Sequence, residues 1–136
     1  MLHIRIVEEK DFASIIDLWK VCGLEHPNID SESMMRRKCA YQKELFLVAE
    51  KDSELIGTVM AGYEGRRGWV NLLAVDPEHQ RQGIATALMD AAEQKLVALD
   101  CPKINLQIRT SNLQAVEFYK KIGYQEDNVV SMGKKL

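Results

Sequence analysis

The stretch from Asn71 to Leu88 holds the residue types and spacing best suited to binding a phosphate group. Its apolar run Leu72–Val75 is typical of a buried strand, Asp76-Pro77 opens a turn, and a helix follows. The first N–H groups of a helix have no intrahelical partner and lie at the positive end of its dipole, so they stabilise an anion. Because Gly83 and Ala85 are small, the backbone can approach a diphosphate closely. A glycine that serves only helix-to-strand packing is the alternative.

A second pattern further along the chain is typical of a helix that carries a reactive hydroxyl. Asn112 and Tyr119 are separated by two helical turns and therefore share one face. Phe118 and Ile122 share another face, which can enter the core. A tyrosine on such a helix can point toward the end of a parallel strand and reach a ligand bound there. A tyrosine that anchors its hydroxyl in a core network is the structural alternative.

The first pattern reads Val75-Asp76-Pro77 and then Gln80-x-x-Gly83-x-Ala85. This string resembles the acyl-CoA signature of the GNAT superfamily of N-acetyltransferases, which is Gln or Arg, x, x, Gly, x, Gly or Ala. It lacks the three glycines of the dinucleotide fingerprint. The alternative is that the turn at Gly83 binds another phosphorylated ligand. In that case the second pattern would be present only by coincidence.

The second pattern runs from Gln107 to Asn112 and on through Phe118-Tyr119-Lys120-Lys121-Ile122-Gly123-Tyr124. It is similar to the second half of the cofactor site of the same superfamily. It looks nearest to the branch of small bacterial ribosomal-protein alanine acetyltransferases. The resemblance covers residues 45–125 well and the N-terminal acceptor region poorly.

The resemblance implies a site for acetyl-CoA as cosubstrate, between the strands that begin at Trp69 and Ile104. Tyr119 would be the general acid that protonates the leaving thiolate. Backbone groups of the first strand would bind the pantetheine arm and the acetyl carbonyl, the following turn would bind the diphosphate, and an asparagine would bond to the arm. The implied cofactor-binding residues are Leu73, Ala74, Val75, Arg81, Gln82, Gly83, Ile84, Ala85, Thr86 and Asn112.

A general base is also expected, because an alkylammonium acceptor with a pKa near 10 is mostly protonated at neutral pH. The alanine acetyltransferase branch has a catalytic glutamate where this chain has Gln107, and an amide cannot accept the proton. That role therefore does not carry over. Glu64, at the end of its strand, is our candidate, with Tyr63 and Glu50 behind it. The alternative for Glu64 is a solvated turn carboxylate.

The bulk properties of the 136-residue chain predict a single domain, residues 1–136, with an ordinary soluble composition. A net charge of −2 argues against nucleic acid as a partner. No apolar run is long enough for a membrane span or a signal peptide, so we expect a cytoplasmic protein with no membrane partner. The three cysteines are widely spaced and are expected to be reduced and mostly buried, and neither they nor the histidines have metal-ligand spacing, so no metal is expected.

Hydrophobic periodicity predicts an α/β fold of the α+β, mixed-sheet kind, with about four flanking helices. Three strands joined by short turns form an antiparallel meander, and a crossover helix then makes the next strand parallel. This is the order of elements in the GNAT fold. The expected strands are residues 3–7, 45–50, 55–63, 69–75 and 104–109, the expected helices are 12–22, 31–42, 84–99 and 112–122, and one or two short strands are expected between Gly123 and Leu136.

Two functions from different classes follow. The first is an N-acetyltransferase that moves acetyl from acetyl-CoA to a primary amine, in a small molecule or in a peptide or protein, by direct attack without a covalent enzyme intermediate. The second is a non-catalytic acyl-CoA-binding sensor or scaffold, which the substitution at Gln107 favours and the retained Tyr119 disfavours. Acceptor specificity is expected in residues 24–44 and in the turn at residues 64–68. The sequence leaves open the acceptor, the physiological role, and whether the chain is a monomer or a homodimer.

Overall fold

The structure is a computed structural model that describes all residues, 1–136, and the chain forms two compact units, Met1–Leu106 and Gln107–Leu136. The first unit holds every strand and three of the α-helices. Its elements in chain order are β1 (Leu2–Ile6), η1 (Glu9–Asp11), α1 (Phe12–Val21), α2 (Ser31–Gln42), η2 (Lys43–Leu45), β2 (Phe46–Lys51), β3 (Glu54–Tyr63), β4 (Gly68–Val75), η3 (Pro77–His79), α3 (Ile84–Ala98) and β5 (Ile104–Leu106).

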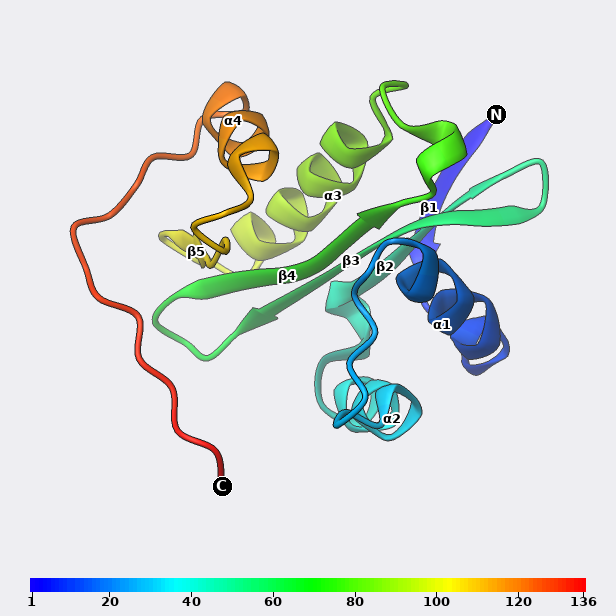
Figure 1. Cartoon of the computed structure of the whole chain (residues 1–136), viewed down its shortest axis with the longest axis horizontal. Helices are drawn as coiled ribbons and strands as arrows, with labels where there is room; N and C mark the ends of the chain where they lie inside the picture. Colours follow the sequence, from blue (N-terminus) through cyan, green and yellow to red (C-terminus); the bar gives the residue numbers. More distant parts are fainter. The chain divides into compact units, whose positions relative to one another are not determined.

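The sheet has five strands in the order β1-β2-β3-β4-β5 (Figure 1). The pairs β1–β2, β2–β3 and β3–β4 are antiparallel, and β4–β5 is parallel. Two short turns join β2 to β3 and β3 to β4, whereas α3 forms the crossover from β4 to β5. The predicted fold class, an antiparallel meander followed by a parallel pair with flanking helices, is therefore confirmed.

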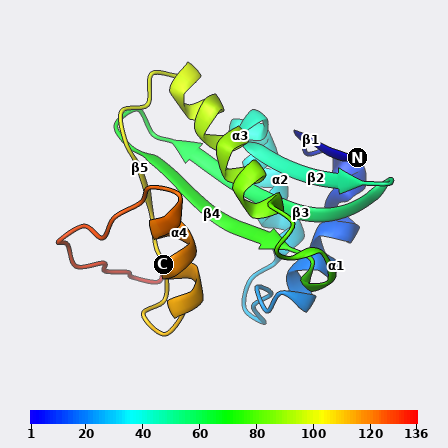
Figure 2. The ribbon, with the colours of Figure 1, turned by 90° about the horizontal axis from the view of Figure 1, so that it is seen from above.

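The helices of the first unit cover both faces of its sheet. Figure 1 shows α3 on one face and α1 and α2 on the other, and in Figure 2 α3 lies over the strands. Gly57 of β3 permits the close approach of α3, because a Cβ atom there would lie 2.9 Å from Leu88 Cδ1 and 3.1 Å from the Ala74 carbonyl oxygen. The absence of a side chain at Gly57 therefore sets the distance between α3 and the sheet.

The main core lies between the sheet and the α1–α2 face. Helix α1 buries Phe12, Ile15, Leu18 and Trp19, a spacing of three and four residues that puts them on one side. The Trp19 ring stacks on Phe46 of β2 with centroids 6.3 Å apart. This amphipathic pattern, rather than helix propensity, fixes α1 on the sheet.

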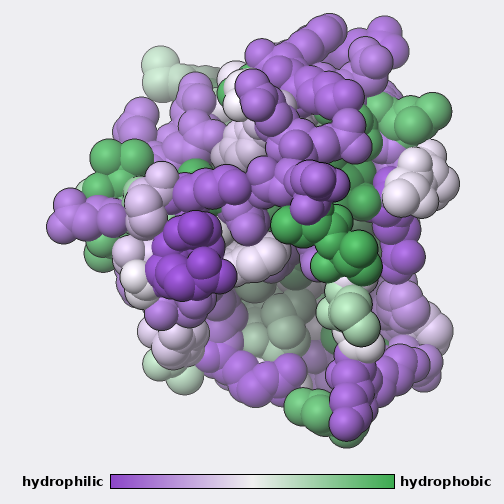
Figure 3. Space-filling view, turned by 90° about the vertical axis from the view of Figure 1, so that its left-hand side faces the viewer, coloured by the Kyte–Doolittle hydropathy of each residue, from purple (hydrophilic) through white to green (hydrophobic).

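The face of the molecule drawn in Figure 3 is mostly hydrophilic, and its hydrophobic residues occur in small groups. No helix in the structure combines the length and the apolar character needed to cross a bilayer. The cysteines Cys22, Cys39 and Cys101 are free, as expected, but each is only partly buried, so the expectation of mostly buried thiols was wrong.

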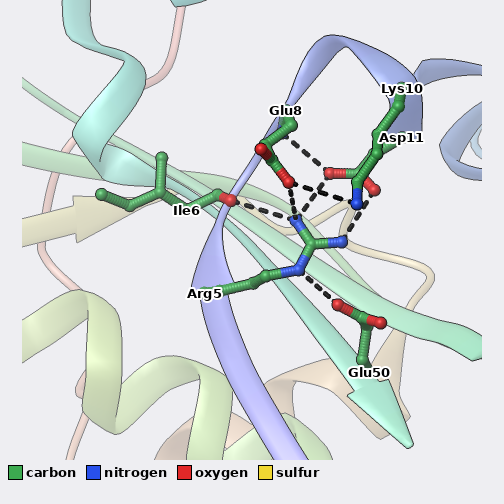
Figure 4. Close-up of polar contacts among 6 residues, drawn as sticks. All are labelled: Arg5, Ile6, Glu8, Lys10, Asp11 and Glu50. Carbon is green, nitrogen blue, oxygen red and sulfur yellow. Dashed lines mark hydrogen bonds and ion pairs between the residues drawn. The ribbon is translucent and has the colours of Figure 1, made fainter. Parts of the chain in front are cut away.

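An ion-pair cluster around Arg5 ties β1 to β2 and to the start of α1 (Figure 4). The Arg5 Nη1 and Nη2 atoms each lie 2.8 Å from an oxygen of Asp11, and Nε donates to Glu50. The Asp11 carboxylate also accepts the backbone N–H of Glu8 at 2.8 Å. These hydrogen bonds, foremost those from Arg5, hold the pKa of the buried Asp11 below its usual value despite the opposing effect of burial.

The second unit contains α4 (Leu113–Lys121) and the chain that follows it. The Asn112 side chain caps α4 by accepting the Ala115 N–H at 3.1 Å. Two sequence expectations were wrong here. The strand expected at residues 104–109 ends at Leu106, and no strand forms between Gly123 and Leu136. The side chains of this final segment are mostly exposed.

Candidate functional site

Half of strand β4 has a free edge. Strand β5 pairs with β4 only at Gly68, Trp69 and Val70, because β5 ends at Leu106. From Asn71 to Val75, β4 is hydrogen-bonded to β3 on one side and has no strand partner on the other. Backbone N–H and C=O groups on an unpaired edge need partners, so this segment can bind an extended ligand as a strand would.

A β-bulge lies within the same segment. Thr58 pairs with Ala74 and Met60 pairs with Asn71, so two residues of β4, Leu72 and Leu73, face one residue of β3. Leu72 has a φ of 52°, which is the left-handed region. A non-glycine residue there costs about 1–2 kcal/mol, and neighbouring contacts must offset this strain.

The turn after β4 has the backbone features of an anion site. Arg81 and Gly83 both have left-handed φ angles, 63° and 79°, and such turns expose successive N–H groups. Gly83 is the N-cap of α3, with no side-chain cap and no acidic residue in the first turn. A Cβ atom on Gly83 would meet nothing within 4 Å, so the approach to the helix end is open. The orphan N–H groups of α3 are thus available to a phosphate.

Two side chains from other elements, together with two from the turn itself, brace this turn. The Val75 carbonyl accepts hydrogen bonds from Cys22 Sγ and Gln80 Nε2, both at 3.4 Å. Lys51 of β2 reaches Gln82 Oε1 at 3.2 Å. Asp76 accepts the backbone N–H of Glu78 at 2.9 Å and so starts η3. The structure therefore brings the predicted contacts at residues 73–75 and 81–86 together as one continuous strand, turn and helix start.

The other two predicted contacts, Asn112 and Tyr119, belong to the second unit. The Tyr119 ring packs edge-on against Phe118 and Tyr124, with centroids 5.1 and 5.6 Å apart. Burial raises the pKa of Tyr119 to about 12, so the hydroxyl keeps its proton at neutral pH. Gln107, which replaces the expected glutamate, donates from Nε2 to Ser131 Oγ.

The predicted base Glu64 lies in the exposed turn between β3 and β4. Its Oε1 accepts the backbone N–H groups of Arg66, at 2.6 Å, and of Arg67. These hydrogen bonds, foremost that from Arg67, lower the pKa of Glu64. Of the two residues ranked behind it, Glu50 is paired with Arg5, and Tyr63 donates to the Gly65 carbonyl at 3.1 Å.

Three residues that sequence reasoning did not assign to the site lie on the sheet face opposite α3. Gly62, Trp69 and Asn105 are neighbours in register across β3, β4 and β5, so their side-chain directions share a face. A Cβ atom on Gly62 would point at Gln42 and Lys38 of α2, 3.4 and 3.5 Å away. Trp69 is 38% exposed on this face, and Asn105 Oδ1 is buried without a hydrogen-bond partner. Neighbouring residues of a strand point to opposite faces of the sheet. The sequence could therefore have indicated that Trp69 faces away from the side on which Val70 is buried.

Comparison with known protein families identifies the family to which this fold belongs. Residues 12–124 match the model described as the acetyltransferase (GNAT) family. The chain is also similar to Ard1 from Thermoplasma volcanium, with a TM-score of 0.81 and 25% identity over 90% of this chain and 81% of that one.

Two further solved structures share the fold. One, from Clostridium acetobutylicum, is described as a predicted acetyltransferase and was solved with acetyl-CoA. Its TM-score is 0.77, with 21% identity over 98% of this chain and 96% of that one. The other is the PaiA N-acetyltransferase from Thermoplasma acidophilum in complex with coenzyme A. Its TM-score is 0.74, with 23% identity over 96% of this chain and 93% of that one. Together with the match to the family model, which spans most of the chain, these features show that the protein belongs to the GNAT family of acetyltransferases.

Proposed function

We propose that this protein transfers the acetyl group of acetyl-CoA to a primary amine by direct attack, as one domain formed by residues 1–136. The observation that carries the proposal is the unpaired edge of β4, which leads directly into a turn with two left-handed residues and an uncapped helix. An extended thiol arm followed by a diphosphate fits that sequence of features. No metal is part of the proposal, and the described residues contain no cluster of metal ligands.

The first half of the cofactor would lie along β4. Backbone groups of Leu73, Ala74 and Val75 would bond to the pantetheine arm, and the Leu73 N–H would bond to the acetyl carbonyl. A donor aimed at that oxygen stabilises the negative charge that develops as the amine attacks, and removal of one such donor costs about 3–4 kcal/mol in comparable enzymes.

The diphosphate would bind mainly to main-chain N–H groups of the turn and of the first turn of α3. The residues proposed for this contact are Arg81, Gln82, Gly83, Ile84, Ala85 and Thr86. Asn112 is proposed to bond to the arm through its amide group, while its Oδ1 caps α4. Main-chain N–H groups suit this task because they are fixed by the fold and cost no side-chain entropy on binding.

Proton transfer would use Tyr119 and Glu64. As the C–N bond forms and the C–S bond breaks, Tyr119 donates its proton to the thiolate, and its raised pKa ensures that the proton is present. Glu64 accepts the proton that the ammonium group must lose before attack, directly or through water. Because its pKa is lowered, Glu64 is a weak base that remains ionised down to acidic pH.

The acceptor would approach over the face formed by Gly62, Trp69 and Asn105. Trp69 is 38% exposed there, and the face of its ring attracts a cation. These features support an amine acceptor, carried either by a small molecule or by a peptide.

Release of free CoA thiol from acetyl-CoA, measured against a panel of amines and short peptides, tests the proposal. Tyr119→Phe should lower kcat by about a hundredfold, the usual contribution of a general acid. Val97→Ala is the control, because Val97 is 67% exposed near the end of α3 and belongs to none of the proposed sites. Saturable acetyl-CoA binding without turnover on any amine would instead favour the second candidate, a non-catalytic acyl-CoA-binding module. The observation behind that candidate is Gln107 in place of the glutamate.

A further inference from the structure

A chain of two hydrogen bonds, the first buried and the second partly buried, connects α1 to the β-bulge of β4. The Trp19 indole Nε1 donates to Thr58 Oγ1 at 3.0 Å, and Thr58 Oγ1 donates to the Leu72 carbonyl at 2.9 Å. Thr58 is fully buried and Trp19 is 1% exposed. Water has no access to the Trp19 and Thr58 side chains, so their polar groups must find partners within the protein.

The direction of this chain is fixed by the chemistry of its ends. An indole N–H can only donate and a carbonyl can only accept. The Thr58 hydroxyl therefore accepts from Trp19 and has a single proton to give, which goes to Leu72. A hydroxyl that was free to rotate would not hold the carbonyl in one place, and the indole removes that freedom.

The carbonyl that receives this bond is part of the bulge. Leu72 is the strained residue with a left-handed φ, and its ladder pairing with β3 is interrupted. The next residue is Leu73, whose N–H we assigned to the acetyl carbonyl. Because Leu72 C=O and Leu73 N–H belong to the same planar peptide unit, fixing the carbonyl oxygen also fixes the direction of the N–H.

We propose that Trp19 and Thr58 are positioning residues for acyl transfer, which hold the Leu72–Leu73 peptide so that its N–H points at the thioester carbonyl. This inference rests on the proposed function, because it requires acetyl-CoA on the edge of β4. Neither residue touches the cofactor. The turn that receives the diphosphate is braced by other side chains, so its affinity for CoA should be independent of them.

The test compares Thr58→Val, which keeps the shape and removes the hydroxyl, with Thr58→Ser, which restores it. Thr58→Val should lower kcat about tenfold or more while the Kd for CoA changes less than about threefold. Thr58→Ser should recover most of the kcat. Ile15→Val, a substitution in the same core at a fully buried position, is the control for lost stability and should leave kcat unchanged.

A second readout does not need turnover. The carbonyl resonance of bound acetyl-CoA, labelled with ¹³C at that carbon, should move downfield in the wild-type protein because of the hydrogen bond, and Thr58→Val should reduce the shift. If Thr58→Val does not fold, Trp19→Phe removes the donor at the other end and should reduce the shift in the same direction.

The outcomes separate the two proposals. A wild-type kcat and an unchanged carbonyl shift in Thr58→Val would overturn the positioning role and leave the acetyltransferase proposal standing. Equal losses in Thr58→Val, Thr58→Ser and Ile15→Val would also overturn it, because they would follow stability and not the hydroxyl. A wild-type protein that binds no acetyl-CoA would overturn the proposed function itself.

Discussion

Replacement of Gly83 by alanine tests the anion site at the start of α3. Gly83 has φ 79° and ψ 9°, where an L-residue costs about 1–2 kcal/mol. The new Cβ meets no heavy atom within 4 Å, so it causes no steric clash. The unfavourable backbone conformation is therefore the whole expected loss of folding stability. For a chain of this size it corresponds to a decrease of about 3–7 °C in Tm.

The effect on CoA binding should be larger than the effect on stability. Relaxation of the turn away from the left-handed conformation, or the methyl group itself, would remove at least one N–H bond to the diphosphate. A hydrogen bond to a charged group is worth about 1.5–3 kcal/mol, so the Kd for CoA should rise about 10-fold to 150-fold. Isothermal titration calorimetry with CoA measures this change, and thermal unfolding without ligand measures the stability term.

Gly65→Ala provides the matched control. Gly65 lies in the turn between β3 and β4, has φ 101°, and also has no heavy atom near the added Cβ. It should lose a similar amount of stability and bind CoA like the wild type. Equal CoA affinity in Gly83→Ala and the wild type, with the expected decrease in Tm, would refute the assignment of the diphosphate to this turn.

Three further predictions concern the charged groups. Arg5→Met leaves Asp11 and Glu50 without their cation and should lower the free energy of unfolding by about 3–5 kcal/mol in a urea titration. Since the pKa of Asp11 is lowered by folding, its stabilisation is complete above pH 4 and is lost as pH falls through the folded-state pKa. Acid titrations should therefore show a steeper loss in the wild type than in Asp11→Asn. Glu64→Gln should lower kcat/KM at neutral pH and recover as pH approaches the pKa of the amine, whereas Glu54→Gln should match the wild type.

Each of these predictions has a contrary result. A wild-type urea midpoint for Arg5→Met would mean that the cluster contributes no net stability. Parallel acid-unfolding curves for the wild type and Asp11→Asn would place the acid sensitivity in other carboxylates. Full activity of Glu64→Gln at every pH would remove Glu64 as the base and leave it the role its contacts show, which is to stabilise the turn.

Local patterns in the sequence were sufficient to predict most of the fold. The amphipathic spacing in α1 and the short turns around β3 depend on neighbours close in the chain, and both were confirmed. The strand, turn and helix around Gly83 were also predicted, because an apolar run, the pair Asp76-Pro77 and a helical pattern after Gly83 follow one another in the sequence. The strands expected near the C-terminus did not form, because the side chains of that segment are mostly exposed and their burial does not stabilise a strand.

The parts of the site that the sequence did not predict depend on distant pairs. Thr58 and Trp19 are 39 positions apart, and nothing local indicates that they meet. The left-handed Leu72 gives no signal either, because leucine rarely adopts that conformation. The unpartnered Oδ1 of Asn105 depends on the register of β4 with β5, and a shift of one residue would reverse its face.

The free edge of β4 has a consequence for the protein without its ligand. An unpaired strand edge is a template on which another chain can add a strand, and such edges promote aggregation. A thiol arm bound along residues 71–75 would form hydrogen bonds with the unpaired backbone N–H and C=O groups. While it is bound, another chain could not add a strand there. We therefore expect the ligand-free protein to aggregate more readily on heating than the CoA-bound protein, beyond the difference in their Tm values. The concentration of free CoA would then determine how much of the protein stays in solution.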